Sequence, residues 1–368
     1  MGGVTTPAWL VSQIDLITSL KDAELNHGIT EVNNPLAYAH IYDFFTVAGE
    51  GAKLYITLLP DDWASNYADA ISTINALKNQ IPEEIRLVGV SPASGGTGYS
   101  ANIRTDVVTS IATLNTIAKQ RSLQYKPTFM VLDGFAPTGT SGFYNLKTMG
   151  ENQYTSVVLS QSQSTFANYN EHGHDINACV GLLLGRLAKI PVQRNVGRVR
   201  DGDMLQAYAY LGEDLIETIS DAVLEELNDK GYIFLKKHVG LGGYYFSDDP
   251  TCTAADSDFS SIARVRTIQK ARRIVRQTLM PYLLDEVEVD PATGRLSAAF
   301  VKSLQAAVEN ALYVQMTANG EIIAPRCTID PKQNVLATNK IDVSVKIIPY
   351  GYAKQIEVTV SFENPVVS

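Results

Sequence analysis

Hydrophobic residues in the first part of the chain recur with a helical period and then with a strand period, several times in succession. Leu36, Ile41 and Phe44 belong to a broad apolar face that ends at Gly49, as expected of a helix with a glycine stop. Repeats of helix followed by strand predict a mainly parallel sheet covered by helices. The expected helices are 35–48, about 63–79 and 106–120, and the strands that follow them are 53–59, 85–90 and 128–132.

A further strand and helix complete this first part, and the pattern changes after Arg200. We expect a strand at 154–159 and a helix at 176–189, with Asp175 as its N-cap. The following segments suggest long helices and antiparallel strands. They are an acidic helix at 203–229, a hairpin at 232–246 turned at 240–243, helices at 262–279 and 297–312, and period-two strands at 340–349 and 355–362.

These elements predict an α/β fold followed by an α+β fold. We expect a helix-covered, mainly parallel sheet domain over 9–250 and a smaller α+β carboxy-terminal assembly domain with antiparallel strands over 251–368. The chain has 368 residues, of which 45% are hydrophobic and 19% are charged, so it can bury a large core, and two domains are the natural expectation. Its net charge of −9 argues against general binding to nucleic acid, which needs a basic surface.

The cysteines and the apolar stretches indicate a protein of a reducing compartment. Cys179, Cys252 and Cys327 lie far apart, which favours neither a disulfide framework nor a zinc site, and a reducing cytoplasm is the simplest compartment. The chain starts without the basic and apolar regions of a signal peptide. Its best apolar stretch, 178–190, is interrupted by two cations, so we expect no membrane span.

Two segments could carry chemistry, and a simpler interpretation is favoured for each. His172-Gly173-His174-Asp175 has residue types that bind zinc or manganese, but no further histidine or carboxylate cluster accompanies it, so we expect a solvated loop. The run 94–98, Ser-Gly-Gly-Thr-Gly, could approach a phosphate through backbone N–H groups. It lacks the Gly-Lys-Ser/Thr end of a P-loop, which favours a flexible loop.

We therefore expect no catalytic residue, no cofactor and no bound metal. No GxSxG motif is present that would indicate a serine hydrolase. A metal- or phosphate-dependent α/β enzyme remains the alternative from another functional class.

The most informative stretch is 178–199, which reads ACVGLLLGRLAKIPVQRNVGRV. A helix rich in small residues, closed by Pro191, runs into a basic turn punctuated by glycine, which describes packing rather than catalysis. The stretch resembles a segment of the contractile-tail sheath proteins, which wrap phage tails and related injection machines. The run 34–54 and the order of elements from Arg264 to Pro365 are similar to the same family, so the resemblance covers most of the chain.

The resemblance implies a structural subunit that polymerises around an inner tube and contracts to drive it. Its partners would be copies of itself in rings or a helical sheath, the inner tail-tube protein, and baseplate and terminator proteins. It would be located in a virion tail or injection-system particle, assembled in the bacterial cytoplasm. A non-contractile phage structural protein is the closest alternative. One feature departs from the family, because the extended amino-terminal arm of sheath subunits looks short or missing before Trp9.

A basic helix is the best candidate for a partner-binding surface, toward the tube or a neighbouring subunit. Apolar residues from Ile262 to Leu279 would form its core face. The alternative is a solvated face that pairs with the acidic residues of 285–290, and such exposed pairs contribute only about 0–1 kcal/mol each. Aromatic residues for stacking on single-stranded nucleic acid are absent from the helix. The basic residues are Arg264, Arg266, Lys270, Arg272, Arg273 and Arg276.

The last period-two strand is a second candidate surface. Ile356, Val358, Val360 and Phe362 share one face, and such a strand could pair with a neighbouring subunit by adding to a sheet edge. An ordinary role as a strand of its own domain is the alternative.

Overall fold

The computed structural model describes residues 13–59, 65–94, 96, 98–172, 175–291 and 293–354. The chain divides into two compact units, unit 1 (Met1–Arg273) and unit 2 (Ile274–Ser368). Within the described ranges, no helix has both the length and the apolar character needed to cross a lipid bilayer.

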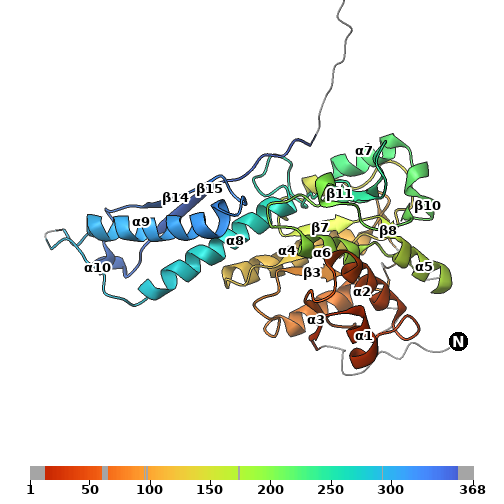
Figure 1. Cartoon of the computed structure of the whole chain (residues 1–368), viewed down its shortest axis with the longest axis horizontal. Coiled ribbons are helices and arrows are strands. Elements are labelled where there is room, and N and C mark those ends of the chain that lie inside the picture. Colours follow the sequence, from red (N-terminus) through yellow and green to blue (C-terminus); the bar gives the residue numbers. More distant parts are fainter. Residues whose placement is uncertain are drawn as a thin grey trace, which may run out of the picture. The chain divides into compact units, whose positions relative to one another are not determined.

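Unit 1 is built around a parallel sheet of four strands in the order β11-β7-β6-β3 (Figure 1). The strand β6 is central and all five of its residues are buried, as expected of a strand covered on both faces. The predicted parallel sheet is therefore confirmed. The strands are β3 (Leu87–Val90), β6 (Phe129–Asp133), β7 (Thr155–Val158) and β11 (Tyr232–Ile233).

The helices of unit 1 largely follow the hydrophobic pattern. The predicted helices at 35–48 and 106–120 are confirmed. Helix α3 begins with a capping box, in which the side chain of Asn66 accepts the backbone N–H of Asp69 and the side chain of Asp69 accepts the backbone N–H of Asn66. The helices are α1 (Leu20–His27), α2 (Pro35–Ala48), α3 (Tyr67–Leu77), α4 (Thr105–Leu123), α5 (Gln163–His172), α6 (Val180–Lys189), α7 (Asp221–Lys230) and α8 (Ile262–Leu279), the last of which extends into unit 2.

Short antiparallel pairs surround the parallel sheet. The predicted strand at 53–59 forms β2, but it pairs antiparallel with β1 rather than entering the central sheet as its first strand. The pairs are β1 (Asp15–Ile17) with β2 (Leu54–Ile56), β4 (Tyr99–Ser100) with β5 (Ile103–Arg104), β9 (Ala209–Leu211) with both β8 (Gln161–Ser162) and β10 (Asp214–Leu215), and β12 (Leu235–Lys236) with β13 (Tyr245–Phe246).

Three local predictions for unit 1 are wrong in whole or in part. The expected helix at 203–229 is interrupted because Gly212 adopts φ 68° at the turn between β9 and β10, and only α7 remains helical. The hairpin predicted at 232–246 is confirmed for β12 and β13, whereas β11 joins the parallel sheet. Asp175 does not cap α6, whose N-cap is Cys179 without a side-chain bond.

Helices α2 and α6 cross at a very short distance. Gly181 and Gly185 lie one turn apart on α6 and face the backbone of α2 at His40 and Phe44. A Cβ atom on Gly181 would overlap the His40 backbone, and one on Gly185 would lie 2.5 Å from the Phe44 carbonyl oxygen. The spacing of these glycines therefore fixes how closely the two helices approach.

Unit 2 contains a helix packed on a two-stranded antiparallel sheet. The predicted helix at 297–312 is confirmed as α9, and Ser297 caps it by accepting a bond from the Phe300 backbone N–H. The strand predicted at 340–349 is β15, and its partner β14 has no counterpart among the predictions. The elements are α9 (Ala298–Leu312), β14 (Ala324–Ile329), α10 (Val335–Thr338) and β15 (Val343–Ile348). The strand predicted at 355–362 lies outside the described residues.

The close crossing predicts that Gly181→Ala destabilises unit 1. The added methyl group must push α2 away from α6, and overpacking of this kind costs about 1–3 kcal/mol. The gain in helix propensity, roughly 1 kcal/mol, offsets only part of that cost. Urea unfolding measures the effect, with Lys189→Ala on the exposed side of the same helix as the control, expected within about 0.5 kcal/mol of wild type. Unchanged or higher stability of Gly181→Ala would contradict the tight crossing.

Candidate assembly surfaces

The end of α6 is joined to the following basic turn by one buried arginine. Arg186 is 1% exposed, and its guanidinium donates to the carbonyl oxygens of Val196, Asp201, Arg198 and Gly202 at 2.8–3.2 Å. Burial lowers the pKa of Arg186 from its ordinary value. Because a planar guanidinium offers donors in fixed directions, this side chain fixes the path of the whole turn.

The same turn is connected to the start of α8. Asn195 donates to the carboxylates of Asp248 and Asp249 at 2.5 and 2.6 Å. Asp249 in turn accepts the backbone N–H of Ala263 at 2.8 Å through its carboxylate and that of Ile262 at 2.8 Å through its carbonyl oxygen. Asp249 therefore satisfies N–H groups in the first turn of α8, where a negative charge is also favourable.

The basic helix α8 contributes a cation to the same carboxyl-terminal end of α6. Arg266 donates to the carbonyl oxygens of Leu187 and Ile190 at 2.8 and 3.3 Å. These carbonyls belong to the last turn of α6, where orphan acceptors and the negative end of the helix dipole favour a cation. Sequence reasoning assigned Arg266 only to a partner surface and did not find this role within the subunit.

The six predicted basic residues do not form one face of α8. Buried residues occur on several sides of its first three turns, as at Ala263, Val265 and Gln269. Arg272 donates to the Ser122 hydroxyl at 2.9 Å, and burial lowers the pKa of Arg273 to about 10. Arg264, Arg266, Lys270 and Arg273 are half-buried, whereas Arg272 and Arg276 are exposed. Of the predicted set, these last two are therefore the most accessible to a partner.

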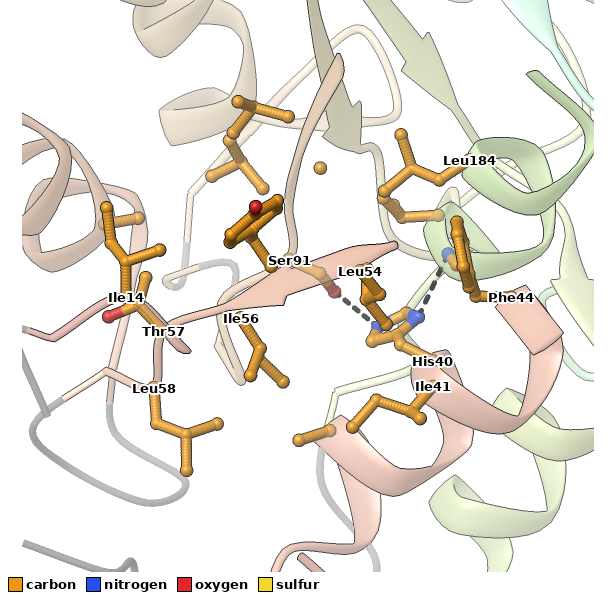
Figure 2. A pocket seen from close by; sticks show the side chains of 18 of the residues that line it. Ile14, His40, Ile41, Phe44, Leu54, Ile56, Thr57, Leu58, Ser91 and Leu184 are labelled. Atoms are coloured by element: carbon orange, nitrogen blue, oxygen red, sulfur yellow. Dashed lines mark hydrogen bonds between the residues drawn. The ribbon is translucent and has the colours of Figure 1, made fainter. Parts of the chain in front are cut away.

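A buried polar chain that the sequence analysis missed lies at the carboxyl ends of β3 and β6. His40 on α2 contacts the Ser91 hydroxyl at 2.8 Å (Figure 2). Ser91 in turn donates to Asp133 at 2.6 Å. Asp133 also accepts from Asn177 and from the backbone N–H of Ala178, each at 2.8 Å. The available signal was the position of Ser91 and Asp133 at or just after the ends of apolar strands.

These hydrogen-bonded side chains, His40, Ser91 and Asp133, are not arranged as a serine nucleophile with its general base. The Gly181 backbone N–H donates to His40 Nδ1 at 3.3 Å, which makes Nδ1 the acceptor and leaves the proton of the neutral ring on Nε2, facing Ser91. Burial lowers the pKa of His40 to about 4 and raises that of Asp133 to about 6. His40 therefore donates to Ser91 instead of accepting its proton. The role of these hydrogen bonds is to connect α2 and α6 to the sheet.

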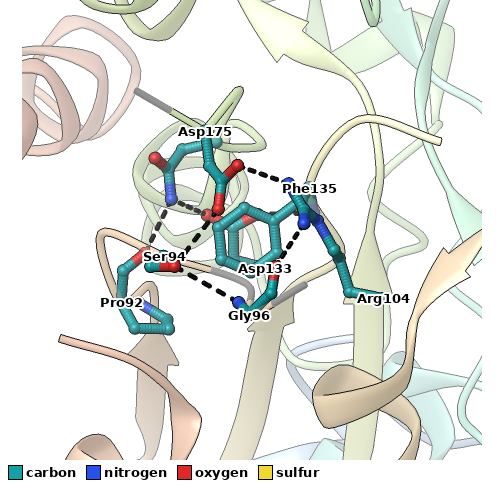
Figure 3. Close-up of polar contacts among 8 residues, drawn as sticks. Pro92, Ser94, Gly96, Arg104, Asp133, Phe135 and Asp175 are labelled. Carbon is teal, nitrogen blue, oxygen red and sulfur yellow. Dashed lines mark hydrogen bonds and ion pairs between the residues drawn. The ribbon is translucent and has the colours of Figure 1, made fainter. Parts of the chain in front are cut away.

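The two segments considered for metal or phosphate binding are joined to each other. Arg104 forms an ion pair with Asp175 and donates to the Gly96 carbonyl oxygen, and Ser94 donates to Asp175 at 3.3 Å (Figure 3). The Gly96 N–H, which a phosphate would need, donates to the Ser94 hydroxyl at 3.2 Å. Gly95, Thr97, Gly173 and His174 lie outside the described residues. Elsewhere in the described chain, no group of three or more His, Cys, Asp or Glu residues could hold a metal ion.

The sheet of unit 2 has one covered edge and one open edge within the described residues. The backbone N–H of Cys327 on β14 donates to Glu309 of α9 at 2.7 Å, so α9 covers that edge. The carbonyl oxygen of Ile348 on β15 accepts from Ile323 on the inner side. The N–H and C=O groups of successive residues in a strand point to alternate sides. Ile348 points its carbonyl toward β14, so Val345, three residues earlier, points its N–H and C=O toward the outer edge, where no described strand pairs.

Comparisons with known proteins give a family and a fold. The family models described as DUF2586, N-terminal domain, and DUF2586, C-terminal domain, match residues 2–250 and 258–367. No curated protein matches the chain.

Three solved structures have a similar fold over nearly the whole chain. The helical sheath of the anti-feeding prophage in its contracted state is 16% identical with a TM-score of 0.62, and 98% of this chain covers 91% of that one. The contracted sheath complex of PVC, an extracellular contractile injection system, is 13% identical with a TM-score of 0.62, at 98% and 90% coverage. A chain of the anti-feeding prophage baseplate is 18% identical with a TM-score of 0.61, at 98% and 90% coverage. They confirm the resemblance to contractile sheath proteins at the level of the fold.

The geometry at the end of α6 predicts that Arg266→Ala destabilises the subunit. The substitution removes a charged donor from two helix-terminal carbonyls, and hydrogen bonds to charged groups contribute about 1.5–3 kcal/mol. Thermal and urea unfolding should show a loss of that order. Gln277→Ala at an exposed position of α8 is the control, expected within about 0.5 kcal/mol of wild type. Equal stability of the two variants would return Arg266 to the surface role assigned from the sequence.

Proposed function

The chain belongs to the DUF2586 family, and from this premise we propose that it is a sheath subunit of a contractile tail or injection system. The observation that carries the proposal is the shared fold with contractile sheath proteins over 98% of the chain. Copies of the subunit form rings or a helical sheath around an inner tube within the particle, and contraction drives the tube. Baseplate and terminator proteins lie at the two ends of the sheath.

The described site geometry favours assembly over catalysis. The buried polar chain at Ser91 is engaged in bonds within the fold, and the Gly-rich segment uses the Gly96 N–H internally. A metal- or phosphate-dependent enzyme is therefore not favoured. The other alternative is a static tail or capsid protein. Such a protein would also self-assemble, but its lattice would not shorten.

The order of domains follows the same proposal. An α/β domain comes first and an α+β assembly domain follows, as the match of separate amino- and carboxy-terminal family models supports. The open outer edge of β15 in the second part suits strand exchange between neighbours, because many backbone bonds hold a connector without fixing the orientation of whole domains. The strand at 355–362, with Ile356, Val358, Val360 and Phe362, remains a candidate donor.

Purified protein should self-associate through heterologous contacts into rings, tubes or filaments rather than closed dimers. Electron microscopy and light scattering over a range of concentration and salt check this expectation. A monomer that persists at high concentration under all salt conditions would contradict the proposed function.

Val345→Pro probes the open edge within the same experiment. Proline removes an N–H that points to the outer side of β15, so the β14–β15 pair is kept while strand addition is blocked. Val345→Ala, which keeps the N–H, is the matched control. Loss of assembly with an unchanged unfolding temperature supports strand exchange at this edge. Assembly equal to that of the control would exclude it.

The exposed part of α8 should bind an acidic surface on the tube or on a neighbouring subunit. We expect Arg272→Glu with Arg276→Glu to weaken tube binding or assembly by up to roughly thirtyfold, since each of the two lost pairs is worth up to about 1 kcal/mol at an exposed site and about 1.4 kcal/mol corresponds to a factor of ten. The effect should shrink in high salt, where the Debye length falls from about 10 Å at 0.1 M to about 3 Å at 1 M.

A charge-matched control separates this surface from net charge. Lys21→Glu with Lys237→Glu changes the net charge equally at exposed positions on α1 and just after β12. Binding measured by co-sedimentation with assembled tubes should be unchanged in the control. If both double variants behave alike, the basic helix has only a solvated face.

A further inference from the structure

Three arginine residues of unit 1 lie on elements that meet at the amino-terminal ends of β3 and β6. Arg86 directly precedes β3, Arg121 is in the last turn of α4, and Arg273 is on the part of α8 that belongs to unit 1. Within the described residues, none of the three forms an ion pair with a carboxylate. The cluster therefore carries positive charge that no direct counter-charge balances.

Hydrogen bonds bring Arg121 next to Arg86. The Arg121 Nε donates to the Thr128 hydroxyl at 2.9 Å, and Thr128 directly precedes β6. The next residue, Phe129, donates its N–H to the Arg86 carbonyl oxygen at 2.9 Å. Arg86 and Thr128 are thus adjacent at the start of two paired parallel strands, and the side chain of Arg121 reaches this point from α4.

A contact between α4 and α8 brings the third arginine to the same place. Arg272 donates to the Ser122 hydroxyl at 2.9 Å, so the turn of α8 that carries Arg273 lies beside the last turn of α4. Burial, and next the positive charge of Arg86, lower the pKa of both Arg121 and Arg273. Arg86 therefore acts electrostatically on both of the other arginines.

Arg121 is the buried member of the cluster. It is 3% exposed and is fixed by Thr128 and by the Lys78 carbonyl oxygen at the end of α3, which accepts from Nη1 at 2.9 Å. Its Nη2 is buried and has no acceptor within the described structure. A buried cation is costly unless it is paired, and a buried N–H is costly unless it donates, so both features indicate a missing partner.

The carboxylates closest to the cluster are already paired with lysines. Glu83 and Glu84 act electrostatically on Arg86. Glu83 forms an ion pair with Lys126 at 3.0 Å, and Glu84 forms one with Lys53 at 3.1 Å. Arg86 itself donates to the carbonyl oxygen of Glu83, which is a neutral acceptor. The missing partner of the cluster is therefore an anion.

We propose that Arg86, Arg121 and Arg273 form a binding site for an oxyanion of the phosphate class. A phosphate group carries about 1.5–2 negative charges at pH 7 and several acceptor oxygens, so it can bond to more than one guanidinium at once. Arg86 and Arg273 are half-buried and supply the accessible donors, and Arg121 adds a buried, fixed charge. A single carboxylate of a neighbouring subunit has one charge and would neutralise less of the cluster.

The site lies within one subunit, so it does not depend on the proposed sheath function. Isothermal titration of the full chain with inorganic phosphate should give one site per chain. Arg273→Gln and, independently, Arg86→Gln should each weaken binding roughly tenfold or more, since each removes hydrogen bonds to a charged group. Lys21→Gln, which makes the same change of charge at an exposed position on α1, should bind phosphate as the wild type does.

Thermal unfolding at equal ionic strength separates a binding site from a purely structural cluster. Phosphate should raise the melting temperature of the wild type above its value in chloride, because a ligand that binds only the folded state stabilises it. In chloride, Arg273→Gln removes one of three repelling charges and should melt at or above the wild-type temperature, but it should gain little from phosphate. Equal gains of the wild type and Arg273→Gln would overturn the proposal.

Two further outcomes identify the source of the anion. Binding of glycerol 3-phosphate as well as inorganic phosphate would support a site that accepts the phosphate group of a larger molecule, and binding of inorganic phosphate alone would support a site for the free ion. If neither binds and Arg273→Gln nevertheless reduces assembly, the counter-charge is a carboxylate of a neighbouring subunit and the phosphate site is wrong.

Discussion

The close crossing of α2 and α6 is the contact on which the rest of unit 1 depends. Gly181 and Gly185 let the two backbones touch, and the same helix covers Gly89 of β3 with Val180 and Leu184. A side chain at Gly181 or Gly185 would push the two helices apart, and interiors packed like crystals transmit such a displacement. The crossing also brings His40 to Ser91 and places Arg186 at the turn that leads toward α8.

The polar groups buried around this crossing act as connectors between elements. Asp133 joins the end of a central strand to the residues that precede α6, Arg186 holds the turn that follows it, and Arg266 satisfies its last carbonyls. Each uses a charged or polar side chain to pair backbone groups that would otherwise be costly to bury. Both ends of α6 are therefore fixed by bonds to other parts of unit 1.

Much of the fold was predictable because local periodicity and burial agree. The helices at 35–48 and 297–312 and the apolar strand β6 followed from pattern alone. The helix expected at 203–229 failed because its acidic period ignored the left-handed turn at Gly212. The six cations of α8 look alike in sequence, but their roles depend on neighbours distant along the chain, such as Leu187 for Arg266 and Ser122 for Arg272.

Rigidity and adaptability are separated within this chain. In unit 1, fixed helix ends and the glycine contacts resist rearrangement, whereas the sheet of unit 2 has only two described strands and leaves the outer edge of β15 uncovered. An isolated two-stranded sheet is marginal in water and gains stability from further strands or a covering helix. Helix α9 already covers β14, so a further strand could stabilise this sheet only by pairing with the outer edge of β15. A neighbouring subunit that supplied a strand there would be held by backbone bonds that tolerate rotation between rigid bodies, which is what the proposed sheath function would require.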